Sequence, residues 1–238
     1  MKISLFIPCF IDSLYPEVAI SIVQVLERLG HEVDYNEEIT CCGQPPFNSG
    51  YWDESRPVAE QCLSGLKDAE VIVSASGSCG AMLKVFYPQL FAGRPQEADA
   101  RRLSAKVWEF SDFLVNCLGV KDVGASFNGR ATFHDGCHGL RELGLKSAPR
   151  ELLRHVRGLE LVEMKEAETC CGFGGTFAVK FPQISTAMAE VKCGSALETG
   201  ADVVVSNDSS CLMQISGYFE RHGKGVPCMH LAQILART

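Results

Sequence analysis

Residues 71–79 read VIVSASGSC, and the same pattern returns at residues 203–211 as VVVSNDSSC. Each segment is a run of β-branched residues that leads through small polar residues to a cysteine. A continuous β-branched run is typical of a parallel strand that is covered on both faces. The recurrence, which needs no gap, indicates that the chain contains an internal repeat.

Other parts of the chain repeat at nearly the same spacing, with offsets between 128 and 132 residues. The matching cysteines are Cys9 with Cys137, Cys41-Cys42-Gly43 with Cys170-Cys171-Gly172, and Cys79 with Cys211. So small a drift is hard to produce by chance. We therefore predict two homologous units, over residues 1–122 and 123–238.

Strand and helix patterns alternate within each unit. In the first, apolar residues 3–8 predict a strand, and apolar residues at helical spacing over 17–29 predict a helix. Residues 31–35 read as a second strand, followed by a helix over about 53–67 and a strand at 71–75. This alternation indicates an α/β fold: two pseudo-symmetric repeats, each with a parallel sheet and right-handed crossovers.

The repeated cysteines all follow predicted strands. Ligands of open α/β sheets bind at the carboxyl ends of the strands, so each unit can gather four thiols at that edge. The two sets are Cys9, Cys41, Cys42 and Cys79, and Cys137, Cys170, Cys171 and Cys211.

Twelve cysteines in 238 residues need an explanation, because a chain of this length can bury a stable core without disulfide or metal cross-links. The apolar opening at residues 3–11 is shorter than the roughly 20 residues of a spanning helix, and the part before Cys9 is too short for a signal peptide. We therefore expect a cytoplasmic protein without a membrane span, in a compartment where structural disulfides are rare. Cysteines in such a compartment indicate metal binding or redox chemistry, with simple packing and disulfides as the alternatives.

The net charge of −7, without any basic cluster, argues against a nucleic-acid partner. The glycine run at residues 172–175 lacks the lysine of a P-loop and the acidic residue of a dinucleotide fold. We therefore do not expect the chain to bind NAD or another nucleotide.

Four thiolates per unit fit either tetrahedral zinc or an iron–sulfur cluster by number. Adjacent cysteines favour the cluster, because neighbours in extended backbone point in opposite directions and can both reach a bulky multi-iron group. Gly172, Gly174 and Gly175 leave backbone N–H groups free to donate to cluster sulfides. Zinc in one of the two units remains the alternative.

Several polar residues and the other cysteines are less informative. His134 and His138 flank Cys137 as donors or proton carriers near the metal, or as surface or capping residues. Asp208 is a candidate helix N-cap. The cysteines without a repeat counterpart are predicted to pack as small apolar residues: Cys62, Cys117, Cys193 and Cys228.

The tandem Cys…Cys-Cys-Gly…Cys pattern resembles the CCG cysteine-rich domain family, which includes the cysteine-rich subunit of heterodisulfide reductase and the iron–sulfur subunit of glycolate oxidase. Over its whole length the chain is most similar to the members that serve lactate utilization. The motifs that carry this resemblance are Pro8-Cys9-Phe10, residues 40–45 (TCCGQP), residues 170–177 (CCGFGGTF) and residues 208–213 (DSSCLM).

The resemblance implies an iron–sulfur electron-transfer subunit of a complex that oxidises L-lactate to pyruvate. Its implied partners are a ferredoxin-type iron–sulfur protein and a third subunit, with a small hydroxy acid as substrate of the whole complex. The resemblance also implies that the eight repeated cysteines are the cluster ligands. The alternatives are a redox subunit serving glycolate or a disulfide, and a zinc-stabilised interaction module without catalytic function.

One feature departs from the heterodisulfide reductase pattern, in which each motif ends in Cys-x-x-Cys. Here Met82 and Gln214 stand where the last cysteines would be. Each site therefore lacks a fifth thiolate, and an ordinary [4Fe–4S] cluster in each repeat is the more economical prediction. Direct disulfide reduction becomes doubtful for the same reason.

Overall fold

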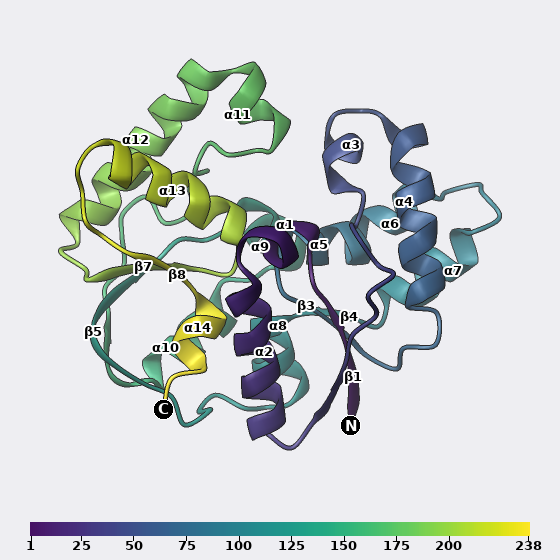
Figure 1. The fold of residues 1–238 in the computed structure, drawn as a ribbon, viewed down its shortest axis with the longest axis horizontal. Coiled ribbons are helices and arrows are strands. Elements are labelled where there is room, and N and C mark those ends of the chain that lie inside the picture. Colours follow the sequence, from purple (N-terminus) through teal and green to yellow (C-terminus); the bar gives the residue numbers. More distant parts are fainter.

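Each half of the chain folds into its own four-stranded parallel sheet in the computed structural model, which describes all 238 residues (Figure 1). The strand order is β2-β1-β3-β4 in the first sheet and β6-β5-β7-β8 in the second. The two orders are the same when the strands of each half are counted from its start. This arrangement confirms the predicted α/β class with two pseudo-symmetric repeats.

The elements of the first repeat are β1 (Lys2–Phe6), α1 (Cys9–Leu14), α2 (Pro16–Arg28), β2 (Glu32–Asp34), α3 (Gln44–Asn48), α4 (Trp52–Gly65), β3 (Ile72–Ser74), α5 (Gly77–Ala81), the π-helical turn η1 (Met82–Phe86), α6 (Tyr87–Leu90), α7 (Glu97–Ser104), β4 (Val107–Glu109), α8 (Phe110–Asp112) and the π-helical turn η2 (Phe113–Cys117).

The elements of the second repeat are β5 (Ser126–Phe133), α9 (Cys137–Leu143), α10 (Ser147–Arg154), β6 (Arg157–Leu161), α11 (Thr176–Lys180), α12 (Pro182–Glu198), β7 (Val203–Ser206), α13 (Ser209–Arg221), β8 (Cys228–His230) and α14 (Leu231–Leu235).

The strands and helices predicted for the first repeat all form, with ends that shift by one or two residues. The helix predicted at 17–29 is α2, and the one predicted at 53–67 is α4. The run at 71–75 contains β3, whose three residues are all buried, as expected for a central parallel strand. The predicted boundary between residues 122 and 123 lies in the link between η2 and β5, and it stays a prediction.

The two faces of each sheet belong to different cores because side chains alternate along a strand. On β1, Ile3 and Leu5 point into a core of 26 buried residues that draws on both repeats. Phe6 points to the other face, into a core that belongs to the first repeat alone. The second repeat has a private core of its own, which includes Val204.

Helices from the two repeats cross over to build the shared core. Helix α2 of the first repeat packs on α14 of the second, and α10 of the second packs on α8 and η2 of the first (Figure 1). Arg28 at the end of α2 donates from Nη1 to the carbonyl oxygens of Val123 (3.1 Å) and Leu235 (3.0 Å). A cation at those carbonyls complements the negative end of α14.

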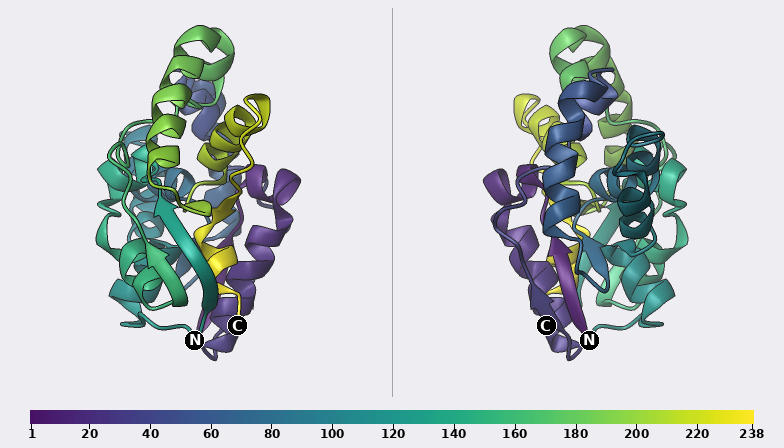
Figure 2. Two further views of the ribbon diagram at one scale, coloured as in Figure 1. Left: turned by 90° about the vertical axis from the view of Figure 1, so that its left-hand side faces the viewer. Right: turned by 90° about the vertical axis from the view of Figure 1, so that its right-hand side faces the viewer.

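Both sheets direct the carboxyl ends of their strands toward the end of the molecule that carries α11 and α3. Figure 2 shows β1 and β5 running in this direction, with the two chain termini at the opposite end. Two further contacts join the repeats close to this edge, α5 with α9 and α1 with α13. No helix combines the length and the apolar character that a bilayer crossing would need.

The shared core predicts that the two repeats unfold together. Ile22 on α2 is fully buried in this core, whereas Ile20 on the same helix is 56% exposed. Ile22→Ala should lower the free energy of unfolding by about 2–5 kcal/mol, and Ile20→Ala by no more than about 0.5 kcal/mol. Urea unfolding followed by circular dichroism should show a single transition for all three proteins; two separated transitions would contradict a shared core.

Candidate metal centre

Four of the repeated cysteines are placed by helices that begin directly after a central strand. Cys9 and Cys137 are the first residues of α1 and α9, which follow β1 and β5. Cys79 and Cys211 lie in the first turns of α5 and α13, which follow β3 and β7. These cysteines follow strands, as the sequence predicts, and each also lies in the first turn of a helix, which its sequence pattern did not indicate.

The first set is closed by short contacts between its sulfur atoms. Cys9 Sγ lies 3.6 Å from Cys41 Sγ, and Cys42 Sγ lies 3.3 Å from Cys79 Sγ. The backbone N–H of Gly43 donates to Cys41 Sγ over 3.4 Å. Residues 41 and 42 come from the loop after β2, so strand β1, strand β3 and this loop bring the four thiols together.

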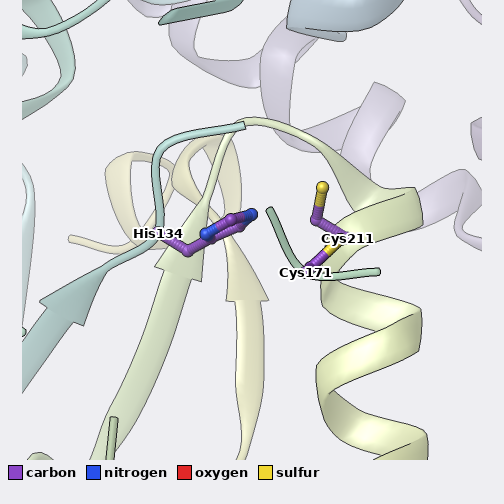
Figure 3. A group of neighbouring side chains, drawn as sticks. All are labelled: His134, Cys171 and Cys211. Atoms are coloured by element: carbon purple, nitrogen blue, oxygen red, sulfur yellow. The ribbon is translucent and has the colours of Figure 1, made fainter. Parts of the chain in front are cut away.

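The second set repeats the arrangement and adds an imidazole. The N–H of Gly172 donates to Cys170 Sγ over 3.4 Å, matching the bond in the first repeat. Ring nitrogens of His134 and the sulfurs of Cys171 and Cys211 all lie within 4.8 Å of one another. Figure 3 shows the His134 ring pointing toward the two sulfurs.

A glycine and a serine fix each Cys-Cys-Gly loop against the helix that follows. Ser55 on α4 donates its hydroxyl to the carbonyl of Gly43, and Ser185 on α12 does the same to Gly172, both over 2.8 Å. Gly43 and Gly172 have φ of +80° and +90°, a region that favours glycine. A Cβ on Gly172 would lie only 2.5 Å from the Ser185 carbonyl oxygen, so the position also needs glycine for space.

All eight cysteines line one cavity of about 260 Å³ between the two repeats. Two contacts join the repeats next to this cavity: Ser49 Oγ lies 3.1 Å from Thr176 Oγ1, and the rings of Phe10 and Phe173 are 5.8 Å apart. The sequence predicted one site in each repeat. It gave no signal that the two sites open onto the same space.

Hydrogen bonds divide the thiols of each set into different protonation states. Bonds from the neighbouring thiols and from backbone N–H groups lower the pKa of Cys41 to about 3 and that of Cys170 to about 2. The pKa of Cys42 and that of Cys171 are raised, because each donates to its neighbouring cysteine and is buried. Since thiolates are the metal-binding form, each set has one preformed ligand.

His134 is fully buried, so the surface or capping role considered for it is wrong. Neither ring nitrogen has a hydrogen-bond partner, and burial lowers its pKa to about 3. A buried neutral imidazole with two free nitrogens is available to a ligand in the site. His138, unlike His134, lines the cavity, with its ring edge-on to Phe86 and its buried Nδ1 without a partner.

Asp208 occupies the N-cap position of α13, as predicted, but its side chain makes no capping hydrogen bond to that helix. Its carboxylate instead accepts bonds from the Ser76 hydroxyl (2.8 Å) and from the N–H and hydroxyl of Ser78 (2.9 Å each), all in the first repeat. Ser76 and Asp208 occupy matching positions of the repeated motif (residues 71–79 and 203–211). The two copies of the motif therefore bind each other at one side of the cavity, which we call the cavity floor. Burial raises the pKa of this carboxyl group.

The residues outside the two sets have other contacts. None of the four unmatched cysteines lines the cavity. Cys62 and Cys193 are buried on α4 and α12, as predicted, and Cys228 is half-buried; Cys117 is exposed, so the packing role predicted for it is wrong. Met82 is buried, and Gln214 donates to Ser185 Oγ over 3.0 Å. The positions where a fifth cysteine would stand are thus filled by side chains with structural roles.

The donor sets fit a thiolate-ligated metal group. Each set offers four sulfurs at a sheet edge together with a backbone N–H that already donates to one of them. Thiolates suit zinc and iron–sulfur clusters and exclude hard cations such as magnesium or calcium. All twelve cysteines are free thiols in the structure.

Comparisons with known proteins agree with this geometry. The profile of the CCG cysteine-rich domain family matches residues 3–84 and 131–216, once in each repeat. Lactate utilization protein A of Geobacillus kaustophilus is 50% identical over 236 residues, covering 99% of this chain and 98% of the relative. The protein of the same name from Bacillus subtilis is 45% identical over 236 residues and covers 99% of both chains.

One solved structure shares the overall fold at low sequence identity. A hypothetical protein from Helicobacter pylori superposes with a TM-score of 0.63 at 10% identity over 98% of this chain. The chain spans 48% of the length of that protein. At this identity the likeness concerns the fold alone.

The glycine of the second Cys-Cys-Gly loop can be tested against another glycine that has a positive φ. Gly144 has φ of +69° and no atom within 4 Å of the place that a Cβ would occupy, so Gly144→Ala carries only the cost of the left-handed conformation, about 1–2 kcal/mol. Gly172→Ala should lose a further 1–3 kcal/mol, roughly, because its methyl group meets the Ser185 carbonyl. Urea unfolding measures both; equal losses would contradict the close packing of this loop.

Proposed function

The chain belongs to the CCG cysteine-rich domain family that includes lactate utilization protein A, and on this premise we propose that it is an iron–sulfur subunit that transfers electrons in the oxidation of L-lactate to pyruvate. The observation that carries the proposal is the composition of the cavity. Eight cysteines line it, and no lysine or arginine does.

The absence of a cationic side chain from the cavity lining bears on where lactate is oxidised. Recognition of a small carboxylate generally uses an arginine or lysine that pairs with it. The charged or titratable lining residues other than cysteine are His138 and Asp208, and a carboxylate such as Asp208 repels an anionic substrate. We therefore place the hydroxy-acid site on another subunit and assign electron transfer to this one.

Two [4Fe–4S] clusters would be held by the two cysteine sets, one in each repeat. Such a cluster exchanges one electron at a time, with a potential set by charge, burial and hydrogen bonds to its sulfurs. Hydrogen bonds lower the pKa of Cys41 and of Cys170, and the N–H groups of Gly43 and Gly172 donate to their sulfurs. Without a fifth thiol per site, the chain has no feature that favours disulfide cleavage.

The proposed subunit would act in the cytoplasm with two partners, a ferredoxin-type iron–sulfur protein and a third subunit. The cavity has two half-buried cysteines in its second set, and Cys9 of the first set is exposed. Cysteines of both sets are thus partly accessible to solvent, which suits a protein that exchanges electrons with partners.

Zinc in the second site is the second candidate. The grouping of His134 with Cys171 and Cys211 is the observation that favours it, because mixed nitrogen and sulfur ligands are typical of structural zinc. The first site has no such imidazole. This arrangement would leave one electron-carrying site and one structural site.

Metal content tests the cofactor. Anaerobically purified protein should contain iron and sulfide for two clusters and show their broad visible absorption. Cys9→Ser and Cys137→Ser should each remove about half of the iron, since each breaks one set. Cys193→Ala, a buried cysteine outside both sets, should retain full iron content. Zinc without iron in both sites would refute the proposal, and about four irons for each zinc, as one cluster and one zinc ion per chain require, would favour the second candidate.

Growth tests the pathway. Deletion of the gene should abolish growth on L-lactate and leave growth on glucose unchanged, because only the first requires this electron path. Wild-type protein should restore growth on lactate, and the Cys41→Ser and Cys170→Ser variants should not. Normal growth of the deletion strain on lactate would exclude the assignment, and failure on glycolate alone would redirect it to the related substrate.

A further inference from the structure

The two cysteine sets share one scaffold but have different electrostatic surroundings. Ser55 on α4 bonds to Gly43 as Ser185 on α12 bonds to Gly172, so α4 and α12 are corresponding helices of the two repeats. Seven residues after these serines come Cys62 and Lys192, which therefore occupy matching positions. Both are fully buried. A neutral thiol beside the first site is thus replaced by an amine beside the second.

Lys192 has no carboxylate partner. Its Nζ donates to the backbone carbonyl oxygens of Glu166 and of Ala167, the latter over 3.1 Å. Burial lowers its pKa to about 8, and the nearby sulfurs of Cys171 and Cys211 act in the opposite direction. Two carbonyl oxygens and no carboxylate face this amine, so its ammonium form is hydrogen-bonded but not neutralised by a partner.

His134 marks a second difference between the sites. It follows Phe133, which faces the shared core as Leu5 does, so His134 matches Phe6. Phe6 lies in the private core of the first repeat with Cys42 and Cys79. The second site therefore has a potential N–H donor at the place where the first site has a benzene ring.

The other buried charges do not cancel the difference. Asp135 is paired with Arg150 over 2.7 Å and with Lys146 over 3.1 Å. Asp208 lies between the two sites, since its carboxylate binds Ser76 and Ser78 beside Cys79. Among acidic and basic residues, the first repeat buries only Glu109, which accepts bonds from Ser111 and Asn207.

A reduced site carries one more negative charge than an oxidised one. A buried cation and a hydrogen bond to the cluster both stabilise that extra charge, more strongly in a low-dielectric interior than in water. We propose that Lys192 and His134 hold the reduction potential of the second site above that of the first, so that an electron shared between the sites resides on the second. The inference rests on the proposed function, because it requires a cluster in each site.

The test is a redox titration of the full-length, anaerobically reconstituted protein, monitored by electron paramagnetic resonance. Cys9→Ser and Cys137→Ser assign the two signals by removing one site each. The second site should be reduced at the higher potential. Lys192→Met should make the second site at least tenfold harder to reduce, which lowers its midpoint by about 59 mV for a one-electron couple. His134→Phe should lower the same midpoint. The midpoint of the first site should stay unchanged in both.

Lys106→Met is the matched control. Its Nζ also donates to a backbone carbonyl, that of Ala69 over 2.5 Å, but it precedes β4 at the opposite edge of the sheet. This variant should leave both midpoints unchanged. Equal midpoints in the wild type, a higher first site, or a Lys192→Met variant with wild-type midpoints would each overturn the inference alone. If Lys192→Met does not assemble, the wild-type order and His134→Phe still decide. Protein without iron in either site would instead overturn the proposed function.

Discussion

The packing of the two repeats on each other is the constraint on which the site depends. Each sheet contributes one face to the shared core, and α2 and α10 cross over to close it. This packing fixes the carboxyl edges of both sheets around one cavity. The hydrogen bonds from Ser76 and Ser78 to Asp208 then join the two edges at the cavity floor. A single repeat would leave an apolar face exposed and half of the cavity unformed.

Duplication has kept the scaffold of the site and changed what surrounds it. The serine-to-glycine bond and the glycine N–H to cysteine bond recur with the same lengths in both repeats. The differences lie in the residues around the cysteines. His134 stands in the second repeat where Phe6 stands in the first, and Lys192 stands where Cys62 does. The hydrogen bonds that hold the two Cys-Cys-Gly loops are thus equal, whereas the charge and polarity around the sulfurs are not. Two sites built this way can differ in potential without differing in ligands.

Much of this could be predicted from the sequence, because the relevant signals are local. The β-branched runs gave the central strands, and the repeat offsets gave two units with four cysteines each. The shared cavity could not be predicted, since the packing of one unit on the other has no local pattern. Lys192 was missed for a similar reason: a lysine on a helix reads as a surface residue, and only its carbonyl partners show otherwise. For Asp208 the repeated motif located the residue but not its partners.

A buried lysine without a carboxylate partner normally costs stability, because the charge loses its hydration. The first repeat shows that the scaffold does not need it, since Cys62 fills the matching position on α4 without charge. His134 similarly replaces an aromatic ring that packs well in the other repeat. Two such costly replacements beside the same cysteine set are hard to explain by packing. They are explained if the second site must hold additional negative charge, which is what an electron acceptor inside a protein has to do.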